Sequence, residues 1–348
     1  MNKQSLRLLS LIVLTIIIIL IILRVIVDKK LSIKLLESFQ INSNLNIQFM
    51  EISEAQSIIR SYHRPYFKKM KPMELVARNV LNDEKEFSNN EIVTKTENFY
   101  CSHILEFSSL EKKYISELIL KTMNRSSYKQ LNKYFVDWKL IKVDSLFEDG
   151  LPHTIDKYIV IPDNFVTELI NLMKKNKIEE AIKNYGSTLT HEQIHVLQRI
   201  YPRLFNQLYT KYWRYKLFPE QKLNLLIDHH VGNKQRLNPD GLNNNYMFKL
   251  KDNSYMIVYV KLNSYELENV TKYGLLVDDI NLTKIGNSTL DNYTYYLNYF
   301  GNIGNNYHPN ELVATLLSEY VMLPGLYKNR KVQLVLRQDS RIFKSNVV

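Results

Sequence analysis

The stretch GSTLTHEQIHVLQR, which runs from Gly186 to Arg199, carries the strongest pattern in the chain. It places His191 and His195 four residues apart and Glu192 directly after the first histidine. In a helix, residues four apart share one face, so both imidazoles can bind the same metal ion. A zinc–nitrogen bond is about 2.0–2.1 Å long. Glu192 is turned by about 100° from His191, so its carboxylate can face a water molecule beside the ion.

A purely structural interpretation competes with this one. In it, the stretch is an amphipathic helix whose histidines are incidental and whose buried face is formed by Leu189, Ile194, Val196, Leu197 and Ile200. The chain has only eight histidines, and a His-Glu-x-x-His pattern arises by chance in roughly 1% of such sequences. The sequence therefore favours a zinc site.

The segment TLTHEQIHVLQ (188–198) resembles the active-site helix of zincin metallopeptidases, in its uncharged flanks and in the hydrophobic residue after the second histidine. The extension typical of metzincins is absent, because Gln198 stands in place of its glycine and Tyr201 in place of its third histidine. Further on, HPNELVATLLSEY (308–320) resembles the second zinc helix of gluzincins, in which a glutamate completes the site. The resemblance implies that Glu311 is the third zinc ligand.

Other side chains compete for that role. Glu319 is the main rival, but it lies eight residues beyond Glu311, about 12 Å along a helix, so the two carboxylates cannot bind the same ion. The adjacent pair His229 and His230 is a further candidate. His153 precedes a strand that in zincins runs beside the cleft, which makes it a candidate for contact with substrate.

The segments around the motif predict an α+β fold, with a zincin-like catalytic domain built on the HExxH helix. KYIVIP (157–162) is typical of a strand, and the segment 164–186 is typical of a helix that closes at its final glycine. Pro202 suits the first position of another helix. YMFKL (246–250) and SYMIVYVKL (254–262) then predict a β-hairpin.

The domain organisation is expected to have four parts. The four parts are an N-terminal transmembrane anchor (1–30), a mostly helical accessory lobe (31–148), a zincin-like metallopeptidase domain (149–327) and a basic C-terminal tail (328–348). The lobe is expected to be helical because its apolar residues recur at helical spacing, as in SLEKKYISELILKTMN (109–124). The boundary between the lobe and the metallopeptidase domain rests on a shift in composition alone.

The anchor is expected from the stretch LLSLIVLTIIIILIILRVIV, which runs from Leu8 to Val27. As a helix it spans about 30 Å, the thickness of the hydrocarbon core of a bilayer. The sequence after it offers no small-residue cleavage site, so we expect an uncleaved anchor rather than a signal peptide. This predicts a single-pass membrane protein, with the sidedness left open because basic residues flank the stretch on both sides.

Composition sets further limits. One cysteine, Cys101, excludes an internal disulfide framework and a multi-cysteine metal cluster. The net charge of +11 is compatible with a solvated basic surface. No basic run is interleaved with aromatic residues in the way that single-strand binders require, so we expect no specific nucleic-acid partner.

Together these features predict a membrane-anchored zinc-dependent peptidase that acts on a peptide or protein substrate. The resemblance implies Zn²⁺ held by His191, His195 and Glu311, with Glu192 as the general base for a zinc-activated water. Tyrosines such as Tyr320, or else His308, are candidates for stabilising the oxyanion, and the sequence leaves the choice between them open.

Two alternatives to a peptidase remain. One is a catalytically degenerate zincin-fold interaction module tethered to a membrane, against which the intact Glu192 argues. The other is a basic membrane-bound protein that binds nucleic acid or anionic lipid, which only the net charge and the tail KNRKVQLVLRQDSRIFKSN (328–346) support.

Overall fold

The computed structural model covers most of the chain between the two termini. The expected anchor (1–30) and basic tail (328–348) lie outside the described residues, and no helix within those residues is long and apolar enough to cross a membrane. The structure describes residues 45–82, 88–124, 135, 137–241, 245–252, 254–278, 282–301 and 303–322. From Ile47 onward these residues form one compact unit.

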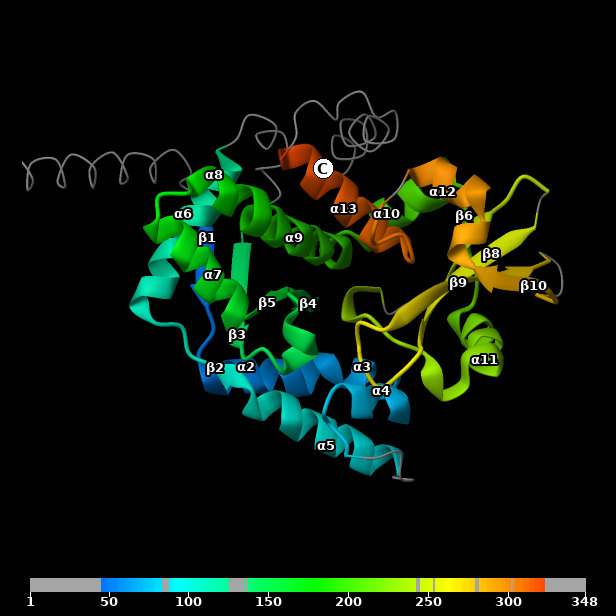
Figure 1. Ribbon diagram of the computed structural model, residues 1–348, viewed down its shortest axis with the longest axis horizontal. Helices are drawn as coiled ribbons and strands as arrows, with labels where there is room; N and C mark the ends of the chain where they lie inside the picture. Colours follow the sequence, from blue (N-terminus) through cyan, green and yellow to red (C-terminus); the bar gives the residue numbers. More distant parts are fainter. Residues whose placement is uncertain are drawn as a thin grey trace, which may run out of the picture. The chain divides into compact units, whose positions relative to one another are not determined.

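The predicted α+β class is confirmed, because helices and two five-stranded sheets make up this unit (Figure 1). The helices are α2 (Ile52–Ile58), α3 (Arg64–Phe67), α4 (Pro72–Ala77), α5 (Asn89–Ser102), α6 (Ser109–Met123), α7 (Asp163–Lys174), α8 (Ile178–Ala181), α9 (Ser187–Ile200), α10 (Pro202–Gln207), α11 (Glu220–Val231), α12 (Thr294–Phe300) and α13 (Pro309–Met322). The strands of the first sheet are β1 (Asn46–Phe49), β2 (Ile104–Leu105), β3 (Asp137–Val143), β4 (His153–Ile155) and β5 (Tyr158–Pro162). Those of the second are β6 (Tyr215–Leu217), β7 (Tyr246–Lys249), β8 (Tyr255–Leu262), β9 (Val270–Val277) and β10 (Lys284–Thr289).

The first sheet has the order β1-β3-β5-β4, with the short β2 also paired to β3. Strands β3 and β5 run parallel, whereas β4 runs antiparallel to β5 and forms one edge. Successive side chains of a strand point to opposite faces. On one face Ile141, Val143 and Val160 join a core cluster with residues of α2 to α5, and on the other face α7 and α9 pack against β5.

This sheet crosses the boundary expected near residue 148. Strand β3, before that point, pairs with β5, after it, so that Leu140 lies opposite Ile159. The region expected to be a mostly helical lobe therefore supplies strands to the same sheet that supports α9. Its longest predicted helix is present as α6, which begins with reciprocal hydrogen bonds between Ser108 and Glu111.

The second sheet is an antiparallel meander of order β10-β9-β8-β7-β6. Strands β7 and β8 form the predicted hairpin, with Phe248 opposite Met256. Helix α11 packs against this sheet through Leu223 and Ile227, which are buried in one core cluster with residues of β7, β8 and β9. This sheet forms the right-hand side of the unit in Figure 1, beyond the ends of α9 and α13.

The helix that was expected to close at Gly186 does not end there. Helix α7 stops at Lys174, and α8, a π-helical segment (Ile182–Gly186) and α9 then follow without a break, so Gly186 has a helical φ of −64°. The glycine serves close packing instead. A Cβ atom at Gly186 would lie 2.4 Å from Oγ1 of Thr122 in α6.

Replacing Gly186 with alanine should lower the free energy of unfolding by about 1–3 kcal/mol, because overpacking of the contact with Thr122 outweighs the better helix propensity of alanine. The double variant Gly186→Ala/Thr122→Ala should be more stable than Gly186→Ala, since Oγ1 of Thr122 has no hydrogen-bond partner among the described residues. Urea denaturation of the single and double variants measures this coupling.

A matched control is Gly304→Ala, because among the described residues, its chain neighbours aside, no heavy atom lies within 4 Å of a Cβ atom built there. It should change the free energy of unfolding by no more than about 0.5 kcal/mol. Strictly additive effects of the changes at residues 122 and 186 would contradict the proposed clash.

Candidate metal centre

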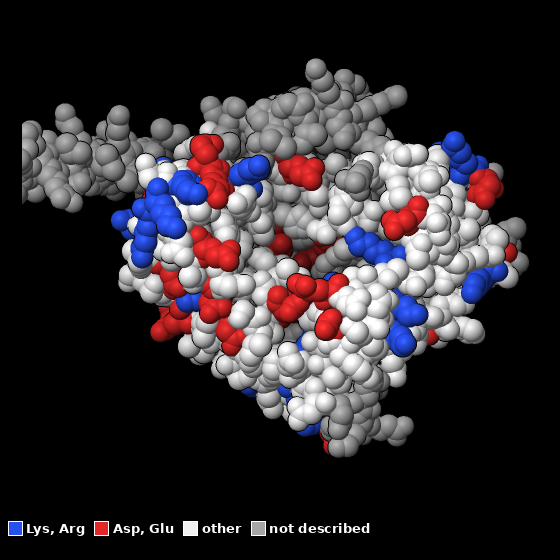
Figure 2. Space-filling model, in the orientation of Figure 1, with Lys and Arg blue, Asp and Glu red and all other residues white. Residues whose placement is uncertain are grey.

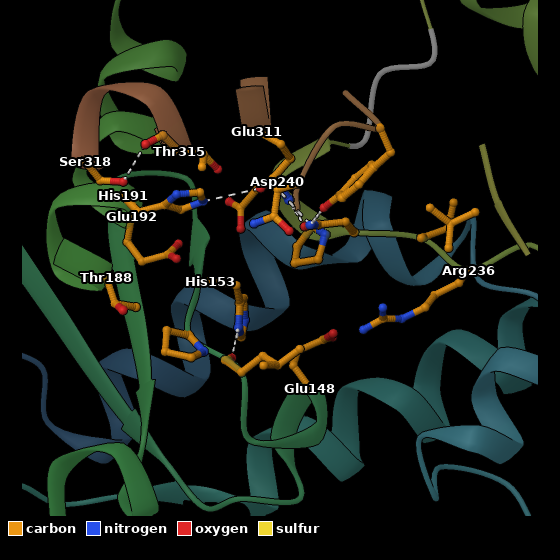
Figure 3. Close-up of a pocket in the computed structure, with 18 of the residues that line it drawn as sticks. Glu148, His153, Thr188, His191, Glu192, Arg236, Asp240, Glu311, Thr315 and Ser318 are labelled. Carbon is orange, nitrogen blue, oxygen red and sulfur yellow. Dashed lines mark hydrogen bonds and ion pairs between the residues drawn. The ribbon is translucent and has the colours of Figure 1, made fainter. Parts of the chain in front are cut away.

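Helices α9 and α13 pack side by side and bring three predicted ligands together (Figures 1 and 3). One oxygen of Glu311 lies 3.3 Å from Nε2 of His191, and the other lies 3.3 Å from Nε2 of His195. The two Nε2 atoms are 3.1 Å apart. These atoms therefore converge on one point, although the histidines and the glutamate are far apart in the sequence.

Helical spacing explains the convergence. His191 and His195 are one turn apart on α9, and Glu311 lies in the first turn of α13. The apolar residues of α9 that the structural interpretation invoked are also buried, except Ile200. The helix thus packs through its apolar face and presents both histidines to α13, so the two interpretations of the motif are compatible.

His195 is held from behind by Gln198. Its Nδ1 lies 2.8 Å from the side-chain oxygen of Gln198, while the amide nitrogen of that glutamine donates to the carbonyl of Asn310 at 2.9 Å. A proton on Nδ1 leaves Nε2 free to face the site. Gln198 therefore fixes the ring of His195 and links α9 to the start of α13.

His191 lacks such support. Its Nδ1 has no hydrogen-bond partner among the residues that the structure describes. Thr315 lines the pocket beside it (Figure 3), but the buried Oγ1 of Thr315 is likewise without a partner there. The two imidazoles are therefore held unequally.

A short segment that precedes β7 supports the glutamate. Asn238 donates to Glu311 at 3.2 Å and also to the hydroxyl of Tyr307. Two residues on, the buried Asp240 forms an ion pair with Arg199 of α9 at 3.0 Å and accepts from the backbone N–H and the hydroxyl of Thr154. Both helices and the edge strand β4 are thus tied to this segment.

Burial and neighbouring charges shift the pKa values of two side chains at the site. Burial lowers the pKa of His195, but the carboxylates of Asp240 and Glu311 outweigh that effect and raise it to about 10. Burial also raises the pKa of Glu192 well above its usual value, and Asp240 adds to the shift. The centre therefore favours a positive charge beside its carboxylates, which a bound cation would supply in place of a proton.

Glu192 lies directly beside this cluster. Its side chain is buried, and Oε2 has no hydrogen-bond partner among the described residues. One carboxylate oxygen of Glu192 and one of Asp240 also lie within 4.8 Å of a ring nitrogen of His195. A buried carboxylate oxygen with no partner is costly, which makes Glu192 a candidate for direct chemistry.

The centre opens into a pocket of about 490 Å³. Figure 2 shows it as a hollow with acidic side chains inside and at its rim. In Figure 3, His191, Glu192 and Thr188 approach from one side and Arg236 from the other. Tyr307, which the sequence did not single out, also lines the pocket.

The other predicted candidates take different places. Glu319 lines the outer part of the pocket and is exposed, and it belongs to neither group of converging metal-ligand atoms among the described residues. His229 and His230 lie at the end of α11 and line a separate groove. His153 is buried at the start of β4 and lines the same pocket as Glu192.

Of the two residues suggested for the oxyanion, only His308 has a side chain within the described part of the chain. The ring of His308 does not line the pocket of the candidate centre; its Nδ1 accepts from the backbone N–H of Asn310 at 3.1 Å and so caps α13. The side chain of Tyr320 lies outside the described part of the chain. Tyr307 is the tyrosine that lines the pocket.

Comparison of the chain with protein-family models, with curated proteins and with solved structures gives no match.

The full-length chain should bind about one zinc ion, and His195→Ala should abolish binding because two ligands rarely hold the ion. Glu311→Ala should lower zinc affinity severely, whereas Glu319→Ala, a matched loss of one carboxylate from the same helix, should leave it unchanged. Metal analysis and competition with a chromophoric chelator measure both effects. Wild-type protein that stays metal-free in zinc-supplemented buffer would falsify the site.

Removal of the hydrogen bond that supports His195 should weaken zinc binding less than removal of a ligand does. We expect Gln198→Ala to weaken zinc binding by about 10- to 100-fold, as for other side chains that orient a metal ligand. Gln193→Ala is the control, since Gln193 donates to the carbonyl of Asp137, away from the centre. Equal losses of zinc affinity in the two variants, measured by chelator competition, would show that the effect of Gln198 is merely structural.

Proposed function

We propose that this protein is a membrane-anchored zinc-dependent peptidase, and that the unit which holds the metal centre is a zincin-like catalytic domain. The observation that carries the proposal is the convergence of His191, His195 and Glu311 beside Glu192, a buried carboxylate with an unpartnered oxygen. The anchor rests on the apolar stretch from Leu8 to Val27.

The ligand set supports zinc. Two imidazoles and one carboxylate are the donors of one common type of catalytic zinc site, which keeps a further coordination position for substrate or water. The charges agree with this choice. Asp240 is neutralised by Arg199, whereas neither Glu192 nor Glu311 forms an ion pair with a lysine or arginine among the described residues. A divalent cation would balance the two remaining carboxylates.

The reaction assigns separate tasks to the metal and to the protein. Zinc, when bound, supplies a Lewis acid that polarises a carbonyl group and acidifies water. Glu192 then accepts a proton from the attacking water and passes it to the leaving amine, as a general base followed by a general acid. Burial, with Asp240 as a second cause, raises the pKa of Glu192, which makes its carboxylate a stronger proton acceptor.

The edge strand β4 lies beside the pocket, and His153 at its start lines the same pocket as Glu192. Its edge is not open for strand pairing, because the backbone N–H of Thr154 donates to Asp240 and the carbonyl of Thr154 accepts from Arg199. The resemblance to zincins implies that a substrate peptide lies beside this strand and crosses the pocket near Glu192. Side chains of the pocket, rather than the backbone of β4, would then hold the peptide.

Catalysis also accounts for Glu192 better than a purely binding role does. A tethered interaction module has no use for a buried carboxylate with an unpartnered oxygen, which costs free energy unless it is compensated. Such local costs are typical of active sites. The placement of Glu192 therefore favours an active peptidase over an inactive relative.

Glu192→Gln separates the fold from the chemistry. Glutamine keeps the size of the side chain but cannot accept a proton at neutral pH, so peptide hydrolysis should fall by roughly two to four orders of magnitude. Zinc stoichiometry and melting temperature should stay near those of the wild type. Cleavage of a peptide library by the full-length chain, read by mass spectrometry with and without a chelator, measures the loss.

The matched control is Glu180→Gln, the same change at an exposed position on α8 that does not line the pocket. It should leave hydrolysis unchanged. If Glu192→Gln cleaves peptides as fast as wild type and a chelator still stops cleavage, Glu192 is not the general base, but the proposed metal centre stands. Absence of any cleavage by zinc-loaded wild type would favour the inactive interaction module.

A further inference from the structure

The pocket has a second polar region, opposite the metal centre, that the proposed reaction does not use. It begins at Arg236, between α11 and β7. The backbone N–H of Arg236 donates to the carbonyl of Val260 at 3.0 Å, and the preceding Gln235 forms a β-bridge with Lys261. The main chain of Arg236 is therefore fixed to β8, and its side chain reaches into the pocket (Figure 3).

The guanidinium of Arg236 has no ion pair or side-chain hydrogen bond within the described part of the chain, and its buried Nε is without a partner there. Arginine carries five N–H donors and remains charged. Its charge acts on the carboxylate of Glu148, but no ion pair or hydrogen bond joins Arg236 to an acid among the described residues. Glu148, which faces it across the pocket in Figure 3, already accepts from Arg78, Tyr66 and Tyr100.

A second cation lies in the same region. Lys272 of β9 lines the pocket and donates to the carbonyl of Gly304 and to the side-chain oxygen of Asn306, both of which are neutral. Val260 and Val270, which also line the pocket, supply apolar surface nearby. Of the other acids that line the pocket, Glu311 and Asp240 are paired at the metal centre, whereas the buried Glu192 and the exposed Glu319 form no ion pair among the described residues. Neither Arg236 nor Lys272 forms an ion pair with a carboxylate among the described residues, so this side of the pocket presents two positive charges without a directly bound counter-ion.

We propose that Arg236, assisted by Lys272, binds a carboxylate of the substrate, so that the enzyme prefers peptides with an acidic group beside the bond that is cleaved. The inference rests on the proposed peptidase function. A guanidinium can hold a carboxylate through two parallel hydrogen bonds, and such charge-assisted bonds are the stronger ones. The carboxylate can belong to the chain terminus or to an aspartate or glutamate side chain, which present the same chemistry.

The test uses the full-length chain and one peptide core in four forms, with a free or amidated C-terminus and with glutamate or glutamine beside the cleaved bond. Wild type should show about 10- to 100-fold higher kcat/KM for one carboxylate form than for its neutral partner. The pair that shows the difference identifies the terminal or the side-chain carboxylate as the ligand.

Variants of Arg236 then assign the preference to this residue. Arg236→Gln should remove the difference between the matched peptides, and Arg236→Glu should reverse it in favour of peptides with lysine in place of the acid. Arg203→Gln, an equal loss of charge at an exposed position on α10, should keep the wild-type preference. A preference that persists in Arg236→Gln, or measurable hydrolysis of all four peptides by wild type at equal rates and with equal affinities, would overturn the proposal.

Binding measurements test the carboxylate subsite independently of peptidase activity. The same peptides are titrated against Glu192→Gln, with and without Arg236→Gln, so that affinity is read without turnover. Carboxylate-dependent binding that requires Arg236 supports the subsite even if wild type hydrolyses no peptide, which would overturn only the peptidase function. Hydrolysis without any carboxylate preference, in rate or affinity, would overturn only the subsite.

Discussion

The contact between α9 and α13 is the constraint on which the rest of the structure depends. It places Glu311, only 2% exposed, against two imidazoles in a region that solvent barely reaches. A buried carboxylate is stable only when charge and hydrogen bonds compensate it. The segment with Asn238 and Asp240 provides part of that compensation, and it in turn fixes Arg199 and β4. The geometry of the pocket thus follows from the need to satisfy one cluster of polar groups.

Local patterns in the sequence predicted much of this arrangement. The spacing of His191, Glu192 and His195 depends only on helix geometry, so it could be read before any tertiary contact was known. The β5 strand and the β7–β8 hairpin were predicted for the same reason, since a β-branched run ended by proline and a short turn between two strand-like runs are local signals. Glu311 required a resemblance to known zinc helices in addition, because nothing within its own helix indicates a metal.

The remaining features depend on contacts between distant segments, which a single sequence does not reveal. Asn238 and Asp240 lie at a single 3-10 turn (Pro239–Gly241) that carries no motif. Gln198 was considered only as a departure from the metzincin pattern. The boundary expected near residue 148 does not separate two domains, and here too the contacts that matter join distant segments. Glu148 has a left-handed backbone, with φ of 51°, and its buried carboxylate is held by Arg78 and Tyr100. Its neighbours in sequence give no sign of that network, and the polar, glycine-containing segment resembles a linker.

The unequal support of the two histidines has a consequence for how a metal would enter and leave. His195 and Glu311 are each held by neighbouring amides, so they form a rigid half of the site before any ion arrives. His191 has no such restraint among the described residues. We therefore expect capture to start on the rigid pair and to finish when the looser ring closes, and release to begin by reversal of that last step. The residence time of the ion would then be set by the rotational freedom of a single side chain.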